Sequence, residues 1–272
     1  MAIAKTCVLR ALFACIFMIG AARADMGLSP LRHVLTPENH SAVFTVSNPS
    51  DRIMDGRVTW VDLSATEMGY APATPDARAG LSAAPYLVVS PAQFRLKPGA
   101  RMTVTVKIKE GARIPKGERR SHLLIETKAS RTPIRKASSS GLEVDIGVGM
   151  SAPVILRNGG KVKADIAETK LLRDDDGLLM LETSIAPTGA VSSFGRIAVT
   201  FADHATGEIR VLGIRENVAG FIDAPRRKVT VPLGFMSLSA GELTVRYEGA
   251  EEFDGLVFDQ RVFDIAPPAD ED

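Results

Sequence analysis

Cysteine is nearly absent from this chain. Of its 272 residues only Cys7 and Cys15 are cysteines, and both lie in an N-terminal segment that we expect to be removed. The mature chain would then contain no thiol. This excludes a disulfide, a thiolate metal site and a cysteine nucleophile.

Histidine and aromatic residues are also scarce, and neither sign of charge dominates. The four histidines show no metal-ligand spacing, and there are only one Trp and three Tyr. We therefore predict no metal site, and the few aromatic residues argue against a carbohydrate-binding face. The formal net charge is +1, and it becomes −2 without Lys5, Arg10 and Arg23 of the N-terminal segment. This near-neutral balance predicts no nucleic-acid partner.

Catalytic motifs are missing as well. The sequence contains no G-x-S-x-G, no P-loop and no glycine-rich dinucleotide motif between a strand and a helix. Two carboxylate pairs remain as acid–base candidates, Glu143 with Asp145 and Glu251 with Glu252, and we interpret both as solvated faces. The sequence therefore predicts a protein that is not an enzyme and uses no cofactor.

The first 24 residues have the organisation of a signal peptide. Lys5 and Arg10 precede an apolar run at residues 11–22, which is too short to span a bilayer. Ala22-Arg23-Ala24 fits a cleavage site, so the mature chain would begin at Asp25. A lipoprotein-type cleavage before Cys15 is disfavoured, because it would leave almost no apolar segment. We expect export to the periplasm and no membrane insertion of the mature chain.

The remaining sequence alternates apolar and polar residues in short stretches separated by turn signals. This pattern is typical of all-β sandwich proteins. We expect strands at residues 42–48, 57–63, 86–89, 102–108 and 122–127, then at 163–170, 178–185, 195–201, 208–214, 228–232, 242–247 and 260–265. Residues 69–84, rich in Ala, Pro and Gly, are expected to be a loop.

The glycine pair at 159–160 marks a domain boundary. The predicted organisation is a signal peptide (1–24), an N-terminal immunoglobulin-like domain (25–157), a C-terminal immunoglobulin-like domain (158–266) and a disordered acidic tail (267–272).

One predicted strand is unusually long. Every second residue between positions 142 and 154 is apolar, beginning with Leu142, Val144, Ile146 and Val148. At about 3.3 Å per residue the strand would measure about 40 Å, at least twice the usual length. It follows a basic, polar stretch at residues 128–141, which we expect to be a mobile loop.

Two interpretations of this strand are open. Its apolar face can fill the core of its own domain, which the residues alone favour slightly. Alternatively, its first half can be an apolar edge that another polypeptide completes by strand addition. Arg32 is also open to two interpretations, an ordinary exposed arginine or a site for a carboxylate or phosphate group.

Several segments together resemble one family. They are residues 28–34 (LSPLRHV), 44–48 (FTVSN), 87–99 (LVVSPAQFRLKPG) and 119–124 (RRSHLL), followed by the alternating strand from Leu142. The chain resembles the PapD-like periplasmic chaperones of the chaperone–usher pathway. The N-terminal half carries most of the resemblance, and the segment from Pro91 to Gly99 is its most specific part.

The resemblance implies two tandem immunoglobulin-like β-sandwich domains in an L or boomerang arrangement. It implies a chaperone that captures pilus or fimbrial subunits by donor-strand complementation and delivers them to an outer-membrane usher. Leu142, Val144, Ile146 and Val148 would fill the groove of the incomplete subunit.

Arg32 would anchor the C-terminal carboxylate of the subunit. Family members place a lysine late in the donated strand as a second cation, but Ser151 stands at that position here. Arg119, Arg120 and Arg157 are candidates to replace it, and the sequence does not choose among them. An exported β-sandwich adhesion or ligand-binding module is the alternative function.

Overall fold

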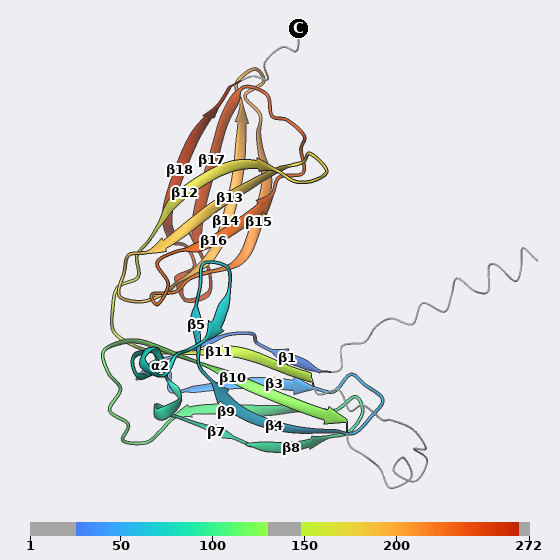
Figure 1. Cartoon of the computed structure of the whole chain (residues 1–272), viewed down its shortest axis with the longest axis vertical. Coiled ribbons are helices and arrows are strands. Elements are labelled where there is room, and N and C mark those ends of the chain that lie inside the picture. The colour runs from blue at the N-terminus through green and yellow to red at the C-terminus, as the bar shows by residue number, and fades with distance from the viewer. Residues whose placement is uncertain (1–25, 130–147, 267–272) are drawn as a thin grey trace, which may run out of the picture.

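The computed structural model describes residues 26–129 and 148–266, and it contains two β-sandwiches joined at an elbow (Figure 1). The expected signal peptide and acidic tail lie outside the described residues, as do Leu142, Val144 and Ile146. The predicted all-β class with two tandem immunoglobulin-like sandwiches in an L arrangement is confirmed.

The first sandwich is built from two sheets. One has the order β1-β3-β9-β7, and the other has the order β2-β11-β10-β4-β8. The strands are β1 (Gly27–Ser29), β2 (His33–Leu35), β3 (Ser41–Ser47), β4 (Met54–Val61), β7 (Leu87–Ser90), β8 (Gln93–Leu96), β9 (Arg101–Ile108), β10 (Gly117–Ala129) and β11 (Val148–Asn158).

Alternation explains how these two sheets pack. In β3, Ala42, Phe44 and Val46 are buried, whereas the residues between them are partly or fully exposed. Val104 and Val106 of the neighbouring β9 are fully buried against them, and Leu123 and Ile125 of β10 meet them from the other sheet. Each such Val, Leu, Ile or Phe side chain contributes about 1.5–3 kcal/mol to folding.

The second sandwich follows the same plan. Its sheets have the orders β12-β13-β16 and β15-β14-β17-β18. The strands are β12 (Ala164–Arg173), β13 (Leu179–Pro187), β14 (Ser193–Asp203), β15 (Ile209–Gly220), β16 (Arg227–Pro232), β17 (Gly241–Gly249) and β18 (Val257–Ile265). All seven strands predicted for this half are present, with ends shifted by a few residues.

The connection between the sandwiches is short. Gly159 and Gly160 follow β11 with φ angles of 72° and 103°, which favour glycine. A Cβ atom on Gly160 would lie 2.7 Å from Val191 Cγ1. The glycines therefore allow a close turn where the chain enters the second sandwich.

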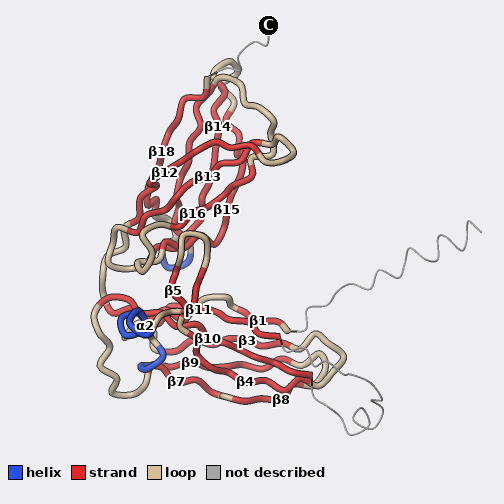
Figure 2. The backbone as a smooth tube through the Cα atoms, viewed as in Figure 1, coloured by secondary structure: helices blue, strands red, loops and turns tan. Residues whose placement is uncertain are grey.

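The prediction that residues 69–84 form a loop is wrong in part. The segment contains the strand β6 (Tyr70–Pro72), which pairs with β5 (Leu63–Ala65), then the helix α2 (Pro75–Leu81) and the 3-10 turn η1 (Ala84–Tyr86). Helix α2 begins where the Thr74 hydroxyl accepts a hydrogen bond from the backbone of Ala77, with Pro75 in the first turn. Figure 2 shows this helix at the elbow and the β5–β6 hairpin extending toward the second sandwich.

Candidate functional site

The strand β11 has an edge that is only partly paired. This strand pairs with β10 along its whole length, from Val148 opposite Thr127 to Asn158 opposite Gly117. On its other side it pairs with β2 only at residues 154–156. Within the described ranges, no strand covers this side of residues 148–153. The free edge is therefore about 20 Å long at the rise of a β-strand.

The free edge exists because the first strand of the chain changes sheets. β1 pairs with β3 in one sheet, and after Pro30 and Leu31 the chain continues as β2 beside β11 in the other. Proline lacks the N–H that a ladder needs, so the pairing is interrupted there. The crossing covers only the last part of β11 and leaves its beginning uncovered.

The two faces of β11 differ as the alternation predicts. Ala152 and Val154 are fully buried in the first sandwich, and Met150 packs against the same core. Gly149 and Ser151 are exposed on the other face. Val148 begins the strand, but the position of its side chain lies outside the described residues. For the part of the strand that is described, the apolar face thus fills its own core.

Arg32 lies at the end of the free edge. It directly precedes His33, whose Cα partner in β11 is Val154. Its guanidinium carbon lies 4.2 Å from the centre of the Phe194 ring in the second sandwich. The side chain is only 8% exposed, so the interpretation of Arg32 as an ordinary exposed arginine is wrong.

Two glutamates of the second sandwich bind this arginine. Arg32 Nη1 donates to Glu251 Oε2 at 2.6 Å and to Glu252 Oε2 at 2.9 Å, and Arg32 Nη2 donates to Glu252 Oε1 at 2.5 Å. Both glutamates lie on the surface, as the sequence predicts, but they are not free carboxylates, because each accepts a hydrogen bond from Arg32. Although burial alone would raise the pKa of Glu252, the hydrogen bond and charge of Arg32 lower it, so this carboxylate is ionised at neutral pH.

Arg157 reaches the same carboxylate from β11. Its Nη1 donates to Glu252 Oε1 at 3.2 Å, while Nη2 donates to Glu118 Oε2 at 2.8 Å. Arg32, Arg157, Glu251 and Glu252 are referred to below as the arginine site. Of the three arginines that the sequence offered as a second cation, Arg157 is the one that the structure places beside Arg32.

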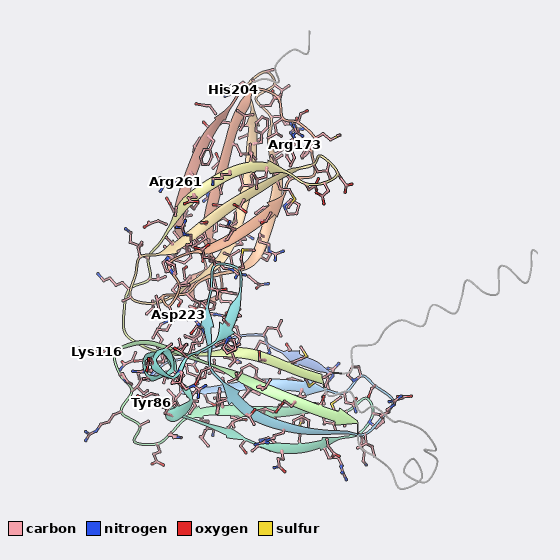
Figure 3. The ribbon with its side chains drawn as sticks, viewed as in Figure 1. Tyr86, Lys116, Arg173, His204, Asp223 and Arg261 are labelled. Atoms are coloured by element: carbon pink, nitrogen blue, oxygen red, sulfur yellow. The ribbon has the colours of Figure 1, made fainter. Side chains whose placement is uncertain are left out.

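The other two arginines have different neighbours. Arg119 donates to the backbone carbonyls of Ala79 and Gly80 at 2.9 Å, at the end of α2. Arg120 is 2% exposed and forms a bidentate pair with Asp223, with Nη1 to Oδ1 at 3.0 Å and Nη2 to Oδ2 at 2.9 Å. Asp223 is labelled at the junction of the two sandwiches in Figure 3.

The β5–β6 hairpin also joins the two sandwiches. The backbone N–H of Ala65 donates to Asp223 Oδ2 at 2.7 Å. At the hairpin turn, the carbonyl of Glu67 accepts from the backbone of Lys228 at 2.8 Å, and its carboxylate lies 3.2 Å from Arg226. These contacts hold the elbow independently of the arginine site. They connect residues far apart in the sequence, so no local pattern predicts them.

His122 is buried beside this junction and lies two residues after Arg120 in β10. It is 2% exposed, its ring packs edge-on against Tyr70 at 4.8 Å, and neither ring nitrogen has a hydrogen-bond partner among the described residues. Burial, with a smaller effect of Arg120, lowers the pKa of His122 from 6.5 to about 4. The imidazole is therefore neutral in the folded protein at neutral pH.

This histidine predicts an acid-sensitive fold. Between pH 6.5 and about 4 the unfolded chain binds a proton that the folded chain excludes, so the free energy of unfolding falls as the pH falls. The expected loss is roughly 3 kcal/mol, complete below the folded pKa. Urea unfolding of His122→Leu at several pH values should lack this loss. The exposed-turn variant His204→Gln should retain it, and equal pH dependence of the His122→Leu and wild-type proteins would contradict the assignment.

The described part of the chain offers little for other chemistry. It contains no group of three or more histidine, cysteine, aspartate or glutamate residues arranged to hold a metal ion. No described helix is long and apolar enough to cross a membrane.

Comparison with known proteins gives only distant structural similarity. No family model matches the sequence, and no curated protein matches it either. The structure is similar to that of the YadV chaperone, with 11% identity, a TM-score of 0.45 and coverage of 89% of this chain and 100% of that one. It is similar to the CupB2 chaperone of Pseudomonas aeruginosa, with 13% identity, a TM-score of 0.43 and coverage of 89% and 100%.

A third similar structure is the Salmonella enterica SafA pilin in complex with the SafB chaperone. The identity is 14%, the TM-score is 0.42, and the match covers 89% of this chain and 97% of that chain. These values describe a likeness of structure only.

Proposed function

We propose that this protein is a periplasmic, non-enzymatic chaperone that captures pilus or fimbrial subunits by donor-strand complementation and delivers them to an outer-membrane usher. The observation that carries the proposal is the free edge at residues 148–153, which ends beside a buried arginine. An uncovered strand edge in line with an apolar, alternating segment is a site for strand addition.

We expect the alternating segment before the free edge to supply the specificity. Leu142, Val144, Ile146 and Val148 continue the apolar phase of Met150 and Ala152, and they would fill the groove of a subunit that lacks its last strand. Four buried aliphatic side chains are worth about 1.5–3 kcal/mol each before ordering costs. A shift of one residue would place Glu143 and Asp145 in the groove, so the register of pairing is strict.

The position of Arg32 sets the direction of the partner strand. β2 runs parallel to β11, and Arg32 lies just before it. Consider a partner strand that pairs with residues 148–153 and is also parallel to β11. The carboxyl end of that strand would lie next to Arg32. Guanidinium groups bind carboxylates through two parallel hydrogen bonds. The C-terminal carboxylate of a subunit is therefore the group that fits this place.

The alternative function, an exported adhesion or ligand-binding module, needs β11 as an ordinary core strand. An open edge on such a strand is a liability, because it presents unpaired N–H and C=O groups to other chains. The described edge at residues 148–153 is paired only with β10, which favours the chaperone.

A retention experiment tests the proposal. The tagged protein would be purified from periplasm under native conditions, and retained proteins would be identified by mass spectrometry. We expect small exported β-rich subunits that lack a final strand. A periplasm that expresses such subunits but yields none with the tagged protein would contradict the proposal.

A further inference from the structure

The arginine site has the chemistry of a carboxylate-binding site, and it already contains a carboxylate. Both carboxylate oxygens of Glu252 accept hydrogen bonds from Arg32, and Oε1 also accepts one from Arg157. Paired guanidinium donors around one carboxylate are the strong, charge-assisted arrangement that such groups prefer. In the described structure the bound carboxylate belongs to the protein itself.

The turn that supplies this carboxylate lies on the other sandwich. This turn is the 3-10 turn η2 (Glu251–Phe253), which lies between β17 and β18. Glu251 has a φ angle of 55°, a conformation that side-chain-bearing residues seldom adopt. The Glu251 side chain is 53% exposed and that of Glu252 is 27% exposed. Both carboxylates thus sit on a short turn that is partly open to solvent, whereas Phe253 of the same turn is buried against Phe258, so Glu252 withdraws by moving its side chain while the turn stays packed.

The two arginines are held by contacts that do not involve these carboxylates. Arg32 lies over the buried ring of Phe194. Arg157 donates to Glu118 through Nε and Nη2, at 3.1 and 2.8 Å, and to the Ser192 carbonyl at 3.3 Å. Withdrawal of Glu252 would therefore leave two oriented guanidinium groups, Arg32 and Arg157, facing the vacated position.

We propose that Glu252 is an internal stand-in that occludes a two-arginine carboxylate site in the free protein. A partner's terminal carboxylate binds Arg32 and Arg157 after the Glu252 side chain moves out to solvent. Arg157 then serves as the second cation, which accounts for a site without a lysine at position 151. The identity of the partner rests on the proposed function, whereas the occlusion itself is a property of this chain alone.

The conservative variant Glu252→Gln tests the occlusion without a partner. It keeps the shape of the side chain and removes the charge between the two arginines. The probe is sodium acetate at constant ionic strength, with chloride as the balancing anion, and the readout is the NMR signal of the Arg32 and Arg157 Nε–H groups. We expect saturable shifts at acetate concentrations at least about tenfold lower than in the wild-type protein, a difference of about 1.4 kcal/mol.

The matched control is Glu248→Gln, which neutralises a carboxylate on β17, the strand that leads into η2; this carboxylate pairs with Arg196 at 2.9 Å. It should behave as the wild-type protein does. Glu251→Gln leaves the bridge from Glu252 to the two arginines in place, so it should lower the saturating acetate concentration by less than Glu252→Gln does. If Glu252→Gln does not fold, Glu251→Gln takes its place in the test. Identical acetate responses in the wild-type protein and both variants at the arginine site would overturn the occlusion.

Measuring subunit retention together with acetate binding distinguishes the occlusion from the proposed function. If the variants gain acetate binding but no form of the protein retains a subunit, the proposed function fails and the occlusion stands. If the wild-type protein retains subunits while the acetate responses are unchanged, the occlusion fails and the proposed function stands.

Discussion

Replacing Ile146 by Asp is expected to abolish subunit retention and leave the free chain folded. The substitution removes an aliphatic side chain worth about 1.5–3 kcal/mol of burial. It also places an unpaired carboxylate in an apolar groove, at a cost of several kcal/mol. Together these effects exceed about 4 kcal/mol, which corresponds to a loss of affinity of at least about a thousandfold. Co-purification from periplasm measures the loss, and circular dichroism checks the fold.

Two control variants isolate the cause. Ile146→Leu keeps the apolar volume and should retain subunits within about tenfold of the wild-type level, because volume-conserving swaps cost less than about 1.5 kcal/mol. Thr103→Asp adds the same charge at an exposed position of β9, in the other sheet, and should have no effect on retention. Retention of subunits by Ile146→Asp at the wild-type level would mean that this face does not enter the partner.

The second large effect is expected at the elbow. Arg120→Met should lower the free energy of unfolding by about 3–5 kcal/mol, because it leaves the Asp223 carboxylate without its buried partner. Arg120 also lies 4.0 Å over the Phe221 ring and donates to the Leu63 carbonyl at 3.1 Å, so its loss loosens both the hairpin and the second sandwich. Urea unfolding measures the change, and we expect the single transition to separate into two.

The adjacent arginine provides the matched control. Arg119→Met removes a side chain that binds only carbonyls of α2 and the Tyr86 ring, and it should cost less than about 1 kcal/mol. The double variant Arg120→Met with Asp223→Leu should recover most of the stability, because it leaves no buried charge unpaired. Equal losses for Arg119→Met and Arg120→Met would show that the ion pair with Asp223 does not hold the elbow.

The local pattern of the sequence predicts much of this fold. Period-two alternation identified every strand of the second sandwich, because in most of these strands the apolar side chains face the core and the residues between them face solvent. The same alternation identified the apolar face of β11, where Ala152 and Val154 are fully buried. The helix α2 was missed because Thr74 and Pro75, which begin it, lie among residues that otherwise indicate a loop.

The contacts between the sandwiches are what local patterns do not reveal. Glu251 and Glu252 are exposed, as the sequence predicts, yet Arg32, more than 200 positions away in the sequence, binds both. Arg120 and Asp223 are likewise brought together only by the elbow.

The central claim is that the free edge of β11 pairs with another polypeptide, and amide hydrogen exchange tests it most directly. Exchange at residues 148–152 would be followed in the free protein and in its purified complex with a subunit. The claim predicts that outward amides there exchange at least about tenfold more slowly in the complex, equivalent to about 1.4 kcal/mol of protection. Unchanged exchange along this edge, with new protection confined to other strands, would contradict it.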